Sequence, residues 1–335
     1  MNIVYSLPFW PYLYTPWLFR ELQWMKLRGH HLAVISLGDP PGPSADVSDF
    51  DLQDVPVLQV RQQYSGDGAL LKNLARVAVG GFRGTSPRSF RELRRGAGLR
   101  QGLQEWSVLK RVTAFVKKHK ADVIEAHWAA HSAMVARDIF HATGTPYAVR
   151  IHGGDVYRNP SPDLAKIVAD AAAVCPVSGF NKSLLLGERP IESLPQVPPV
   201  DFNQSKLHVC HNGIPEASIG TEPAPQEGDT IVVGTIGRVD PVKHHADLIE
   251  AAALLRDECP QLRILIIGGG ELEPSLRKLA EERGIADRVT ITGPQSWSKV
   301  MELRQQFNVY AQVSEAEGCS LAVAEGLGLG VPAIL

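Results

Sequence analysis

The chain has 335 residues, of which 44% are hydrophobic and 21% charged, so it can bury the cores of about two domains and is not a disordered chain. Its formal net charge of −2 argues against a nucleic-acid-binding protein. Four cysteines without a CxxC spacing indicate reduced thiols rather than a disulfide framework or a zinc site. The apolar N-terminus lacks a basic leader and its prolines break any long helix, so we expect a cytoplasmic protein without a transmembrane span.

Apolar runs alternate with helical periodicity through the first half of the chain. The opening residues predict a strand at 2–6, a helix at 15–28, and strands at 31–37 and 55–60. Further along, strands are predicted at 122–126, 146–151, 172–177 and 206–210, and helices at 129–143, 163–171 and 180–186. This β–α–β alternation predicts an α/β fold with a doubly wound parallel sheet.

Residues 76–111 form a basic stretch, in which nine lysine and arginine residues stand against two acidic ones, Glu92 and Glu105. Apolar residues are interspersed among the charges. One interpretation is a solvated helical face. The alternative is a surface that meets anionic lipid, which would make the protein peripheral on the inner face of the membrane.

The proline-rich stretch 221–229 marks a domain boundary, so we expect domains at 1–220 and 221–335. The second domain restarts the alternation. Its predicted strands are 231–236, 262–267, 289–291, 308–313 and 331–335, and its predicted helices are 244–257, 273–283, 296–307 and 320–329. Two consecutive doubly wound domains predict a cleft between them, with ligands bound at the carboxyl ends of the strands.

In the stretch 314–335, Glu317 and Glu325 stand on either side of a predicted helix start. The backbone N–H groups at such a start attract phosphate, because they lack helical partners and lie at the positive end of the helix dipole. The residues at this start are Gly318, Cys319, Ser320 and Leu321. Glu325 is suited to a ribose diol and Glu317 to a sugar beyond the phosphates, which together favour a nucleotide-sugar. The alternative is that both acids only compensate the dipole.

A second candidate segment is 234–243, which follows a predicted strand and precedes a helix. Gly237 lets the backbone turn, and Arg238 and Lys243 are two fixed cations that suit a diphosphate. Cations at a helix start oppose the dipole, so their placement favours an anionic ligand over a plain surface. Gly268 follows the next strand and predicts a tight turn near the nucleotide.

The third candidate region lies where two first-domain strands end, at His127 and His152. Gly153 and Gly154 allow a ligand to approach closely, so His152 is a candidate to hydrogen-bond a sugar hydroxyl or to steady positive charge. Asp155 either faces an acceptor or caps the next segment. His127 either lines the acceptor side or packs in the core.

Taken together, these stretches resemble glycosyltransferase family 4, retaining enzymes of the GT-B fold, and most closely the branch that builds exopolysaccharide and colanic-acid-type polymers. The resemblance covers residues 121–335. It rests on an ordered set of motifs: HGGD from His152, Asn212-Gly213, Gly237-Arg238 with Lys243, and Glu317 with Glu325 before Gly330-Val331-Pro332. It implies an α/β GT-B fold, with two Rossmann-like doubly wound domains facing across a cleft. The second domain is expected to be incomplete, because the chain stops at Leu335 directly after a predicted strand.

The resemblance also implies a role for each candidate. Arg238 and Lys243 would hold the donor diphosphate. Glu325 would bind the ribose and Glu317 the transferred sugar, which His152 would contact from the other domain. No metal and no cofactor are expected, the donor is a UDP- or GDP-linked sugar, and the acceptor is a glycan or a polyprenyl-linked molecule. Retention would follow from attack on the same face, with the leaving phosphate taking the acceptor's proton.

Two alternatives to sugar transfer remain open. A UDP-sugar epimerase of GT-B type would need acid and base groups facing the sugar C2, and product analysis without an acceptor would reveal it. A non-catalytic nucleotide-sugar-binding fragment would follow from the expected incompleteness of the second domain. Donor binding without turnover would support that third interpretation.

Overall fold

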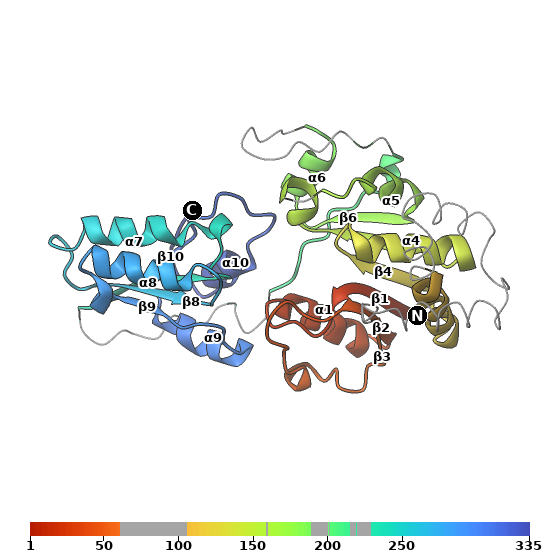
Figure 1. Ribbon diagram of the computed structural model, residues 1–335, viewed down its shortest axis with the longest axis horizontal. Helices are drawn as coiled ribbons and strands as arrows, with labels where there is room; N and C mark the ends of the chain where they lie inside the picture. The colour runs from red at the N-terminus through yellow and green to blue at the C-terminus, as the bar shows by residue number, and fades with distance from the viewer. Residues whose placement is uncertain (61–105, 159, 189–199, 201, 215–218, 220–228) are drawn as a thin grey trace, which may run out of the picture. The chain divides into compact units, whose positions relative to one another are not determined.

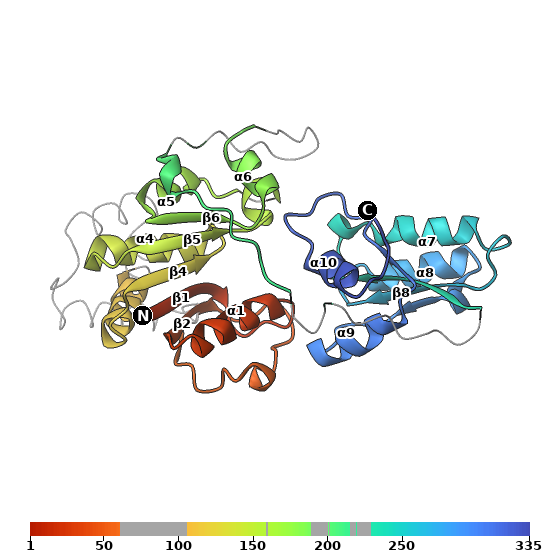
Figure 2. The same cartoon turned by 180° about the vertical axis from the view of Figure 1, so that it is seen from behind.

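The computed structural model describes residues 1–60, 106–158, 160–188, 200, 202–214, 219 and 229–335 (Figure 1). The chain divides into two compact units, Met1–Tyr12 with Glu21–His211, and Leu13–Arg20 with Asn212–Leu335. Each unit holds one parallel β-sheet flanked by helices (Figures 1 and 2). The expected linker lies almost entirely outside the described residues.

The first unit contains a six-stranded parallel sheet in the order β3-β2-β1-β4-β5-β6. Its strands are β1 (Asn2–Phe9), β2 (His31–Gly38), β3 (Val57–Gln59), β4 (Val123–His127), β5 (Tyr147–Ile151) and β6 (Ala173–Pro176). The order reverses between β1 and β4, which are neighbours with Ser6 opposite Ala126. Doubly wound sheets bind ligands at such a reversal, outside the carboxyl ends of the strands.

Burial on both faces explains why the strands of the first sheet read as continuous apolar runs. Strand β2 buries six consecutive residues, 32–37, which is typical of a parallel strand covered on both sides. The helices labelled in Figure 1 that belong to this unit are α1 (Pro16–Leu27) from Glu21 onward, α4 (His131–Thr143), α5 (Leu164–Asp170) and α6 (Gly179–Leu185). Helix α4 packs against β1 and β4, and it ends at Gly144, whose left-handed backbone lets its N–H cap the carbonyl of Phe140.

The strand expected at 206–210 is not formed. A 3-10 turn, Gln204–Lys206, opens this segment, and Leu207 makes only a single bridge to Val174 of β6. The N–H groups of His208 and Cys210 donate to β6 carbonyls. The segment therefore runs beside β6 without the repeated pairing that extends a strand.

The basic stretch falls mostly outside the described residues, which resume at 106. Residues 106–118 are helical, and Trp106 and Leu109 are buried. Arg111 donates from Nη2 to the backbone oxygen of Gln59, at 2.9 Å. This part of the stretch packs onto the first unit, and its contact with lipid remains a prediction. In the part of the chain that the structure describes, no helix is both long and apolar enough to cross a membrane.

The second unit repeats the doubly wound pattern with five parallel strands in the order β11-β10-β7-β8-β9. The strands are β7 (Ile231–Ile236), β8 (Leu262–Ile267), β9 (Val289–Ile291), β10 (Val309–Ala311) and β11 (Ala333–Ile334). The helices are α7 (His245–Leu254), α8 (Glu273–Glu282), α9 (Trp297–Leu303) and α10 (Leu321–Gly328). The helix expected at 296–307 is shorter, because a 3-10 turn, Arg304–Gln306, follows α9. Here the strand order reverses between β7 and β10.

Strand β8 shows how the second sheet is covered on both faces. Ile264 and Ile266 belong to a hydrophobic cluster that includes Leu248 of α7 and Leu276 of α8. The alternating residues Leu265 and Ile267 belong to a second cluster, which draws in partly buried residues of α9 and α10. Because successive side chains of a strand point to opposite faces, the two clusters lie on opposite sides of the sheet.

Candidate active site

Two of the predicted site residues meet at the strand-order reversal of the second sheet. Lys243 ends the 3-10 turn after β7, and Glu317 lies in the loop after β10. Nζ of Lys243 is 2.5 Å from Oε1 of Glu317. The two loops are also joined through the backbone, because the N–H of Glu315 donates to the carbonyl of Val242 at 3.0 Å. Both groups therefore lie where a sheet of this kind binds its ligand.

Gln312, directly after β10, is a site residue that the motifs did not reveal. It is buried, and its Nε2 donates to Oε1 of Glu317 at 2.9 Å. Its Oε1 accepts from the hydroxyls of Tyr310, at 2.9 Å, and Ser320, at 3.2 Å. Gln312 thus links Glu317 to the start of α10. One signal in the sequence could have revealed Gln312: it is a polar residue at the end of an apolar strand, next to the strand-order reversal.

The start of α10 has the form expected of the stretch 318–321. Ser320 is the N-cap and its Oγ accepts from the N–H of Val323 at 3.4 Å, while Leu321 is the first helical residue. Gly318 and Cys319 lie in the preceding loop. Burial, and secondarily the charge of Glu317, raise the pKa of the Cys319 thiol. Cys319 is therefore not disposed to act as a thiolate nucleophile.

Arg238 and Glu325 are the other two residues expected to bind the donor, and each pairs with an oppositely charged side chain. Nη2 of Arg238 is 2.9 Å from Oδ2 of Asp240, and the arginine side chain is 46% exposed. Glu325 is buried on α10, with Oε2 3.3 Å from Nη1 of Arg304. The expected diphosphate and ribose contacts of these two residues remain predictions.

Gly237 and Gly268 bring their backbones into close contact. A Cβ at Gly268 would lie 1.9 Å from the carbonyl oxygen of Gly237, and Gly268 has a φ of +143°. At Gly237 a Cβ would lie 3.3 Å from Cε of Lys243. Gly268, directly after β8, therefore allows the turn after β7 to pack closely against it. That turn carries Arg238.

We expect Gly268→Ala to lower the free energy of unfolding by about 3 kcal/mol, because the added Cβ combines a backbone clash with a strained φ. Denaturant titration of both proteins measures the loss. Gly293→Ala is the matched control. Gly293 also has positive φ, of 70°, but open space around its Cβ position, so it should lose only about 1 kcal/mol. Equal losses in the two variants would show that the close approach contributes nothing.

His245, the first residue of α7, gives the second unit a pH dependence. Burial and the charge of Lys243 lower the pKa of His245 to about 4, and Asp240 opposes this only in part. An unfolded histidine titrates near pH 6.5. As the pH falls from about 6.5 to about 4, the unfolded state gains a proton that the folded state does not. The free energy of unfolding should therefore fall by up to about 3 kcal/mol across that window.

His245→Gln should flatten this dependence, which denaturant titrations at a series of pH values measure. Burial also lowers the pKa of His152 in the first unit. The wild-type protein and the variant therefore share the acid sensitivity that His152 contributes. The difference between wild type and variant at each pH isolates His245. Parallel pH profiles would contradict the prediction.

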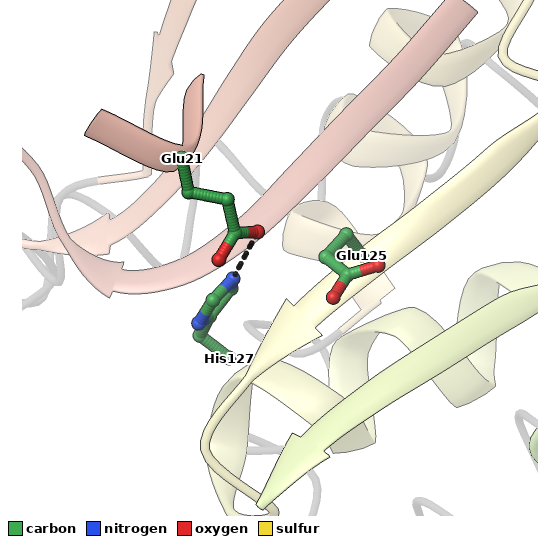
Figure 3. A group of neighbouring side chains, drawn as sticks. All are labelled: Glu21, Glu125 and His127. Carbon is green, nitrogen blue, oxygen red and sulfur yellow. Dashed lines mark hydrogen bonds and ion pairs between the residues drawn. The ribbon is translucent and has the colours of Figure 1, made fainter. Parts of the chain in front are cut away.

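In the first unit, His127 and His152 lie together, as the strand ends of β4 and β5 predict. Both are buried, and Nδ1 of His127 is 3.2 Å from Nε2 of His152. Nε2 of His127 lies 3.3 Å from Oε1 of Glu21 on α1, the contact drawn as a dashed line in Figure 3. Burial, and secondarily the charge of Arg150, lower the pKa of His152 well below its ordinary value. His152 is therefore neutral at physiological pH.

Arg150 joins two carboxylates of this cluster. Its Nη2 lies 3.5 Å from Oε1 of Glu21 and 3.3 Å from Oε1 of Glu125. Burial alone would raise the pKa of Glu21, but the hydrogen bond from His127 and the charge of Arg150 outweigh it and hold that pKa below its ordinary value. Burial raises the pKa of Glu125, against the opposing charge of Arg150. Glu21 is therefore ionised at neutral pH.

Glu21, Glu125 and His127 are also a candidate group of metal ligands, with ligand atoms within 4.8 Å of one another (Figure 3). The permanently charged guanidinium of Arg150, however, already lies beside both carboxylates. A metal ion there would meet repulsion from the guanidinium at close range. We therefore interpret the group as a charge and hydrogen-bond network. The expected independence from metals and cofactors remains a prediction.

Gly153 and Asp155 shape the loop after β5. Oδ2 of Asp155 accepts from the backbone N–H of His152 at 2.7 Å, and the carbonyl of Gly153 accepts from the N–H of Val156 at 3.1 Å. Burial raises the pKa of Asp155 to about 7, despite hydrogen bonds from backbone N–H groups. Asp155 thus steadies the backbone of His152, and it does so from within the turn Gly154–Arg158 rather than as a cap before it. Its contact with an acceptor remains a prediction.

Two doubly wound parallel sheets in one chain define a GT-B fold, the class that the resemblance implied. Among solved structures of this class, that of HepE from Anabaena in complex with UDP-glucose aligns with a TM-score of 0.66. The alignment covers 99% of this chain and 79% of HepE, at 17% sequence identity. A likeness at that identity establishes the fold.

Residues 221–335 match the family model of the glycosyl transferases group 1. The putative glycosyltransferase EpsF of Bacillus subtilis (strain 168) is 24% identical over 178 residues, which are 50% of this chain and 43% of EpsF. The D-inositol 3-phosphate glycosyltransferase of Mycolicibacterium smegmatis is 35% identical over 111 residues, which are 32% of this chain and 25% of that relative. The matches thus span less than half the length of these curated relatives.

Proposed function

We propose that the chain is a glycosyltransferase, which moves a sugar from a nucleotide-sugar donor to a glycan or lipid-linked acceptor. One observation carries the proposal: Lys243 and Glu317 form an ion pair at the strand-order reversal of the second sheet, beside the N-cap Ser320. That region matches the family model of the glycosyl transferases group 1. A cation, a helix N-terminus and a carboxylate are the groups that a diphosphate and a sugar require.

The ion pair suggests how a donor would engage this site. A diphosphate carries more negative charge than one carboxylate, so it would draw Nζ of Lys243 away from Glu317. Glu317 would then be available to accept hydrogen bonds from the hydroxyls of the transferred sugar, while Gln312 keeps its carboxylate in place. The half-exposed guanidinium of Arg238 would add a second cation.

The resemblance to family 4 supports a retaining reaction without a metal ion. The acceptor oxygen would bond to the sugar C1 on the face that the diphosphate leaves, and the acceptor's proton would pass to the leaving phosphate oxygen. Lys243 and Arg238 would stabilise the negative charge that develops on that phosphate. His152 is neutral, so it would serve a sugar hydroxyl as a hydrogen-bond partner rather than as a fixed charge.

A thermal-shift and calorimetric screen with UDP-, GDP- and ADP-sugars tests this function. UDP-glucose is the first candidate, because HepE is solved in complex with it. The true donor should stabilise the protein by RT ln(1 + [L]/Kd), about 2.7 kcal/mol at 100 times Kd, and Lys243→Ala should abolish the shift. Absence of a shift with every nucleotide-sugar would refute the proposal. Incubation with the bound donor, with and without acceptors, then separates transfer from epimerisation and from binding alone.

A further inference from the structure

We propose that Glu21 and His127 form a positioning relay that fixes which ring nitrogen of His152 carries its proton. The relay is a continuous chain of three side chains from three elements of the first unit. Oε1 of Glu21 on α1 is 3.3 Å from Nε2 of His127, and Nδ1 of His127 is 3.2 Å from Nε2 of His152. His127 is fully buried between the other two.

The chemistry of each group sets the direction of the relay. An ionised carboxylate can only accept, so Nε2 of His127 donates its proton to Glu21. A neutral imidazole has one N–H, so Nδ1 of His127 must accept, and Nε2 of His152 is its donor. His152 is then held as the Nε2–H tautomer, and its Nδ1 carries no proton.

The relay as proposed has His127 as a neutral imidazole, whose single N–H donates to Glu21. Among the described residues, the titratable groups in contact with this cluster include Glu21, Glu125, Arg150, Tyr5 and Asp155. Arg150 already supplies positive charge to both carboxylates, and the hydroxyl of Tyr5 donates to Oε1 of Glu21 at 3.4 Å. A second proton on His127 would make Nδ1 a donor and reverse the tautomer of His152. The two charge states therefore predict opposite tautomers, which a measurement can separate.

The surroundings of His152 favour a single orientation of its ring. Its backbone N–H is held by Asp155 at 2.7 Å. Its ring lies against two others, with centroids 4.8 Å from Trp128 and 5.4 Å from His127. With the orientation and the tautomer both set, Nδ1 is an acceptor of fixed direction. If the proposed sugar transfer holds, this acceptor is suited to a sugar hydroxyl that donates its proton.

The tautomer can be measured on the full chain by NMR of 15N-labelled histidine, with His152→Gln assigning the resonances. At neutral pH we expect His152 to be a single Nε2–H tautomer. Glu21→Gln should preserve it, because the amide oxygen can still accept from His127. Glu21→Met removes the acceptor and should convert His152 to a mixture of both tautomers. His141→Gln removes another carboxylate-bonded histidine of the unit, partnered by Asp170, and should leave the His152 signals unchanged.

An Nδ1–H or doubly protonated His152 in the wild-type protein would overturn the relay, whatever the variants show. An unchanged tautomer in a folded Glu21→Met variant would overturn it as well. The wild-type and Glu21→Gln spectra decide the matter if Glu21→Met fails to fold. None of these spectra depends on sugar transfer, so loss of the proposed function and loss of the relay are separate results.

Discussion

Replacing Lys243 with alanine is expected to lower kcat/KM for sugar transfer by about 10²–10³-fold. Lys243 is a cation at the strand-order reversal of the second sheet, and it pairs there with the carboxylate of Glu317. Losing it would remove charge stabilisation from the departing diphosphate. Steady-state kinetics with the donor found in the nucleotide-sugar screen measure the effect, and the loss should appear in kcat as well as in donor affinity.

Lys278→Ala is the matched control for this prediction. Lys278 lies on α8, is 75% exposed, and pairs with Glu282 at 3.4 Å. Its removal deletes the same charge from the same unit without touching the candidate site, so kinetics should stay within about 2-fold of wild type. A Lys243→Ala enzyme with near-normal turnover would remove the proposed role of this lysine, and a comparable loss in Lys278→Ala would attribute the effect to overall charge.

Glu325→Ala is expected to lower the free energy of unfolding by about 3–5 kcal/mol, because it would leave the guanidinium of Arg304 buried without this carboxylate. The side chains of the pair are only 9% and 6% exposed, so water cannot replace the lost partner. Denaturant titration measures the loss. The exposed pair of Lys278 and Glu282 is again the comparison, and Glu282→Ala should cost less than about 1 kcal/mol.

A second substitution at this position, Glu325→Gln, tests the expected ribose contact of Glu325. Glu325→Gln keeps the shape of the side chain and one acceptor oxygen, so it should fold better than Glu325→Ala while still losing most turnover. A well-folded Glu325→Gln enzyme with normal donor affinity would confine Glu325 to a structural role. Near-normal kinetics in both Lys243→Ala and Glu325→Ala would refute the glycosyltransferase proposal itself.

Local pattern predicted the elements of the second unit closely. Strands β7, β8 and β9 begin and end at the expected residues, because each is a short apolar run bounded by polar or glycine-containing turns. The strand expected at 206–210 did not form, because the segment makes only a single bridge to β6. Repeated pairing with a neighbouring strand, rather than apolar character, decides whether such a segment becomes a strand. Composition alone cannot report whether a partner strand offers a continuous ladder.

The candidate sites were foreseeable only in part. Lys243 and Glu317 could be assigned to one place because both follow parallel strands at their carboxyl ends, and the structure pairs them. Gln312 carried no motif, and its importance comes from hydrogen bonds to Glu317, Tyr310 and Ser320 that only folding assembles. Arg238 and Glu325 have partners, Asp240 and Arg304, that the motif spacing did not suggest.

The amino-acid order was enough to predict an α/β chain of two doubly wound halves, because the period of apolar residues follows from the geometry of each strand and helix. It was also enough to locate strand ends that bear His127, His152, Lys243 and Glu317. It could not pair Glu21 with His127, which are 106 positions apart yet 3.3 Å from each other. Such contacts depend on which strands become neighbours and on how a helix packs over them, and the packing of the whole unit settles both.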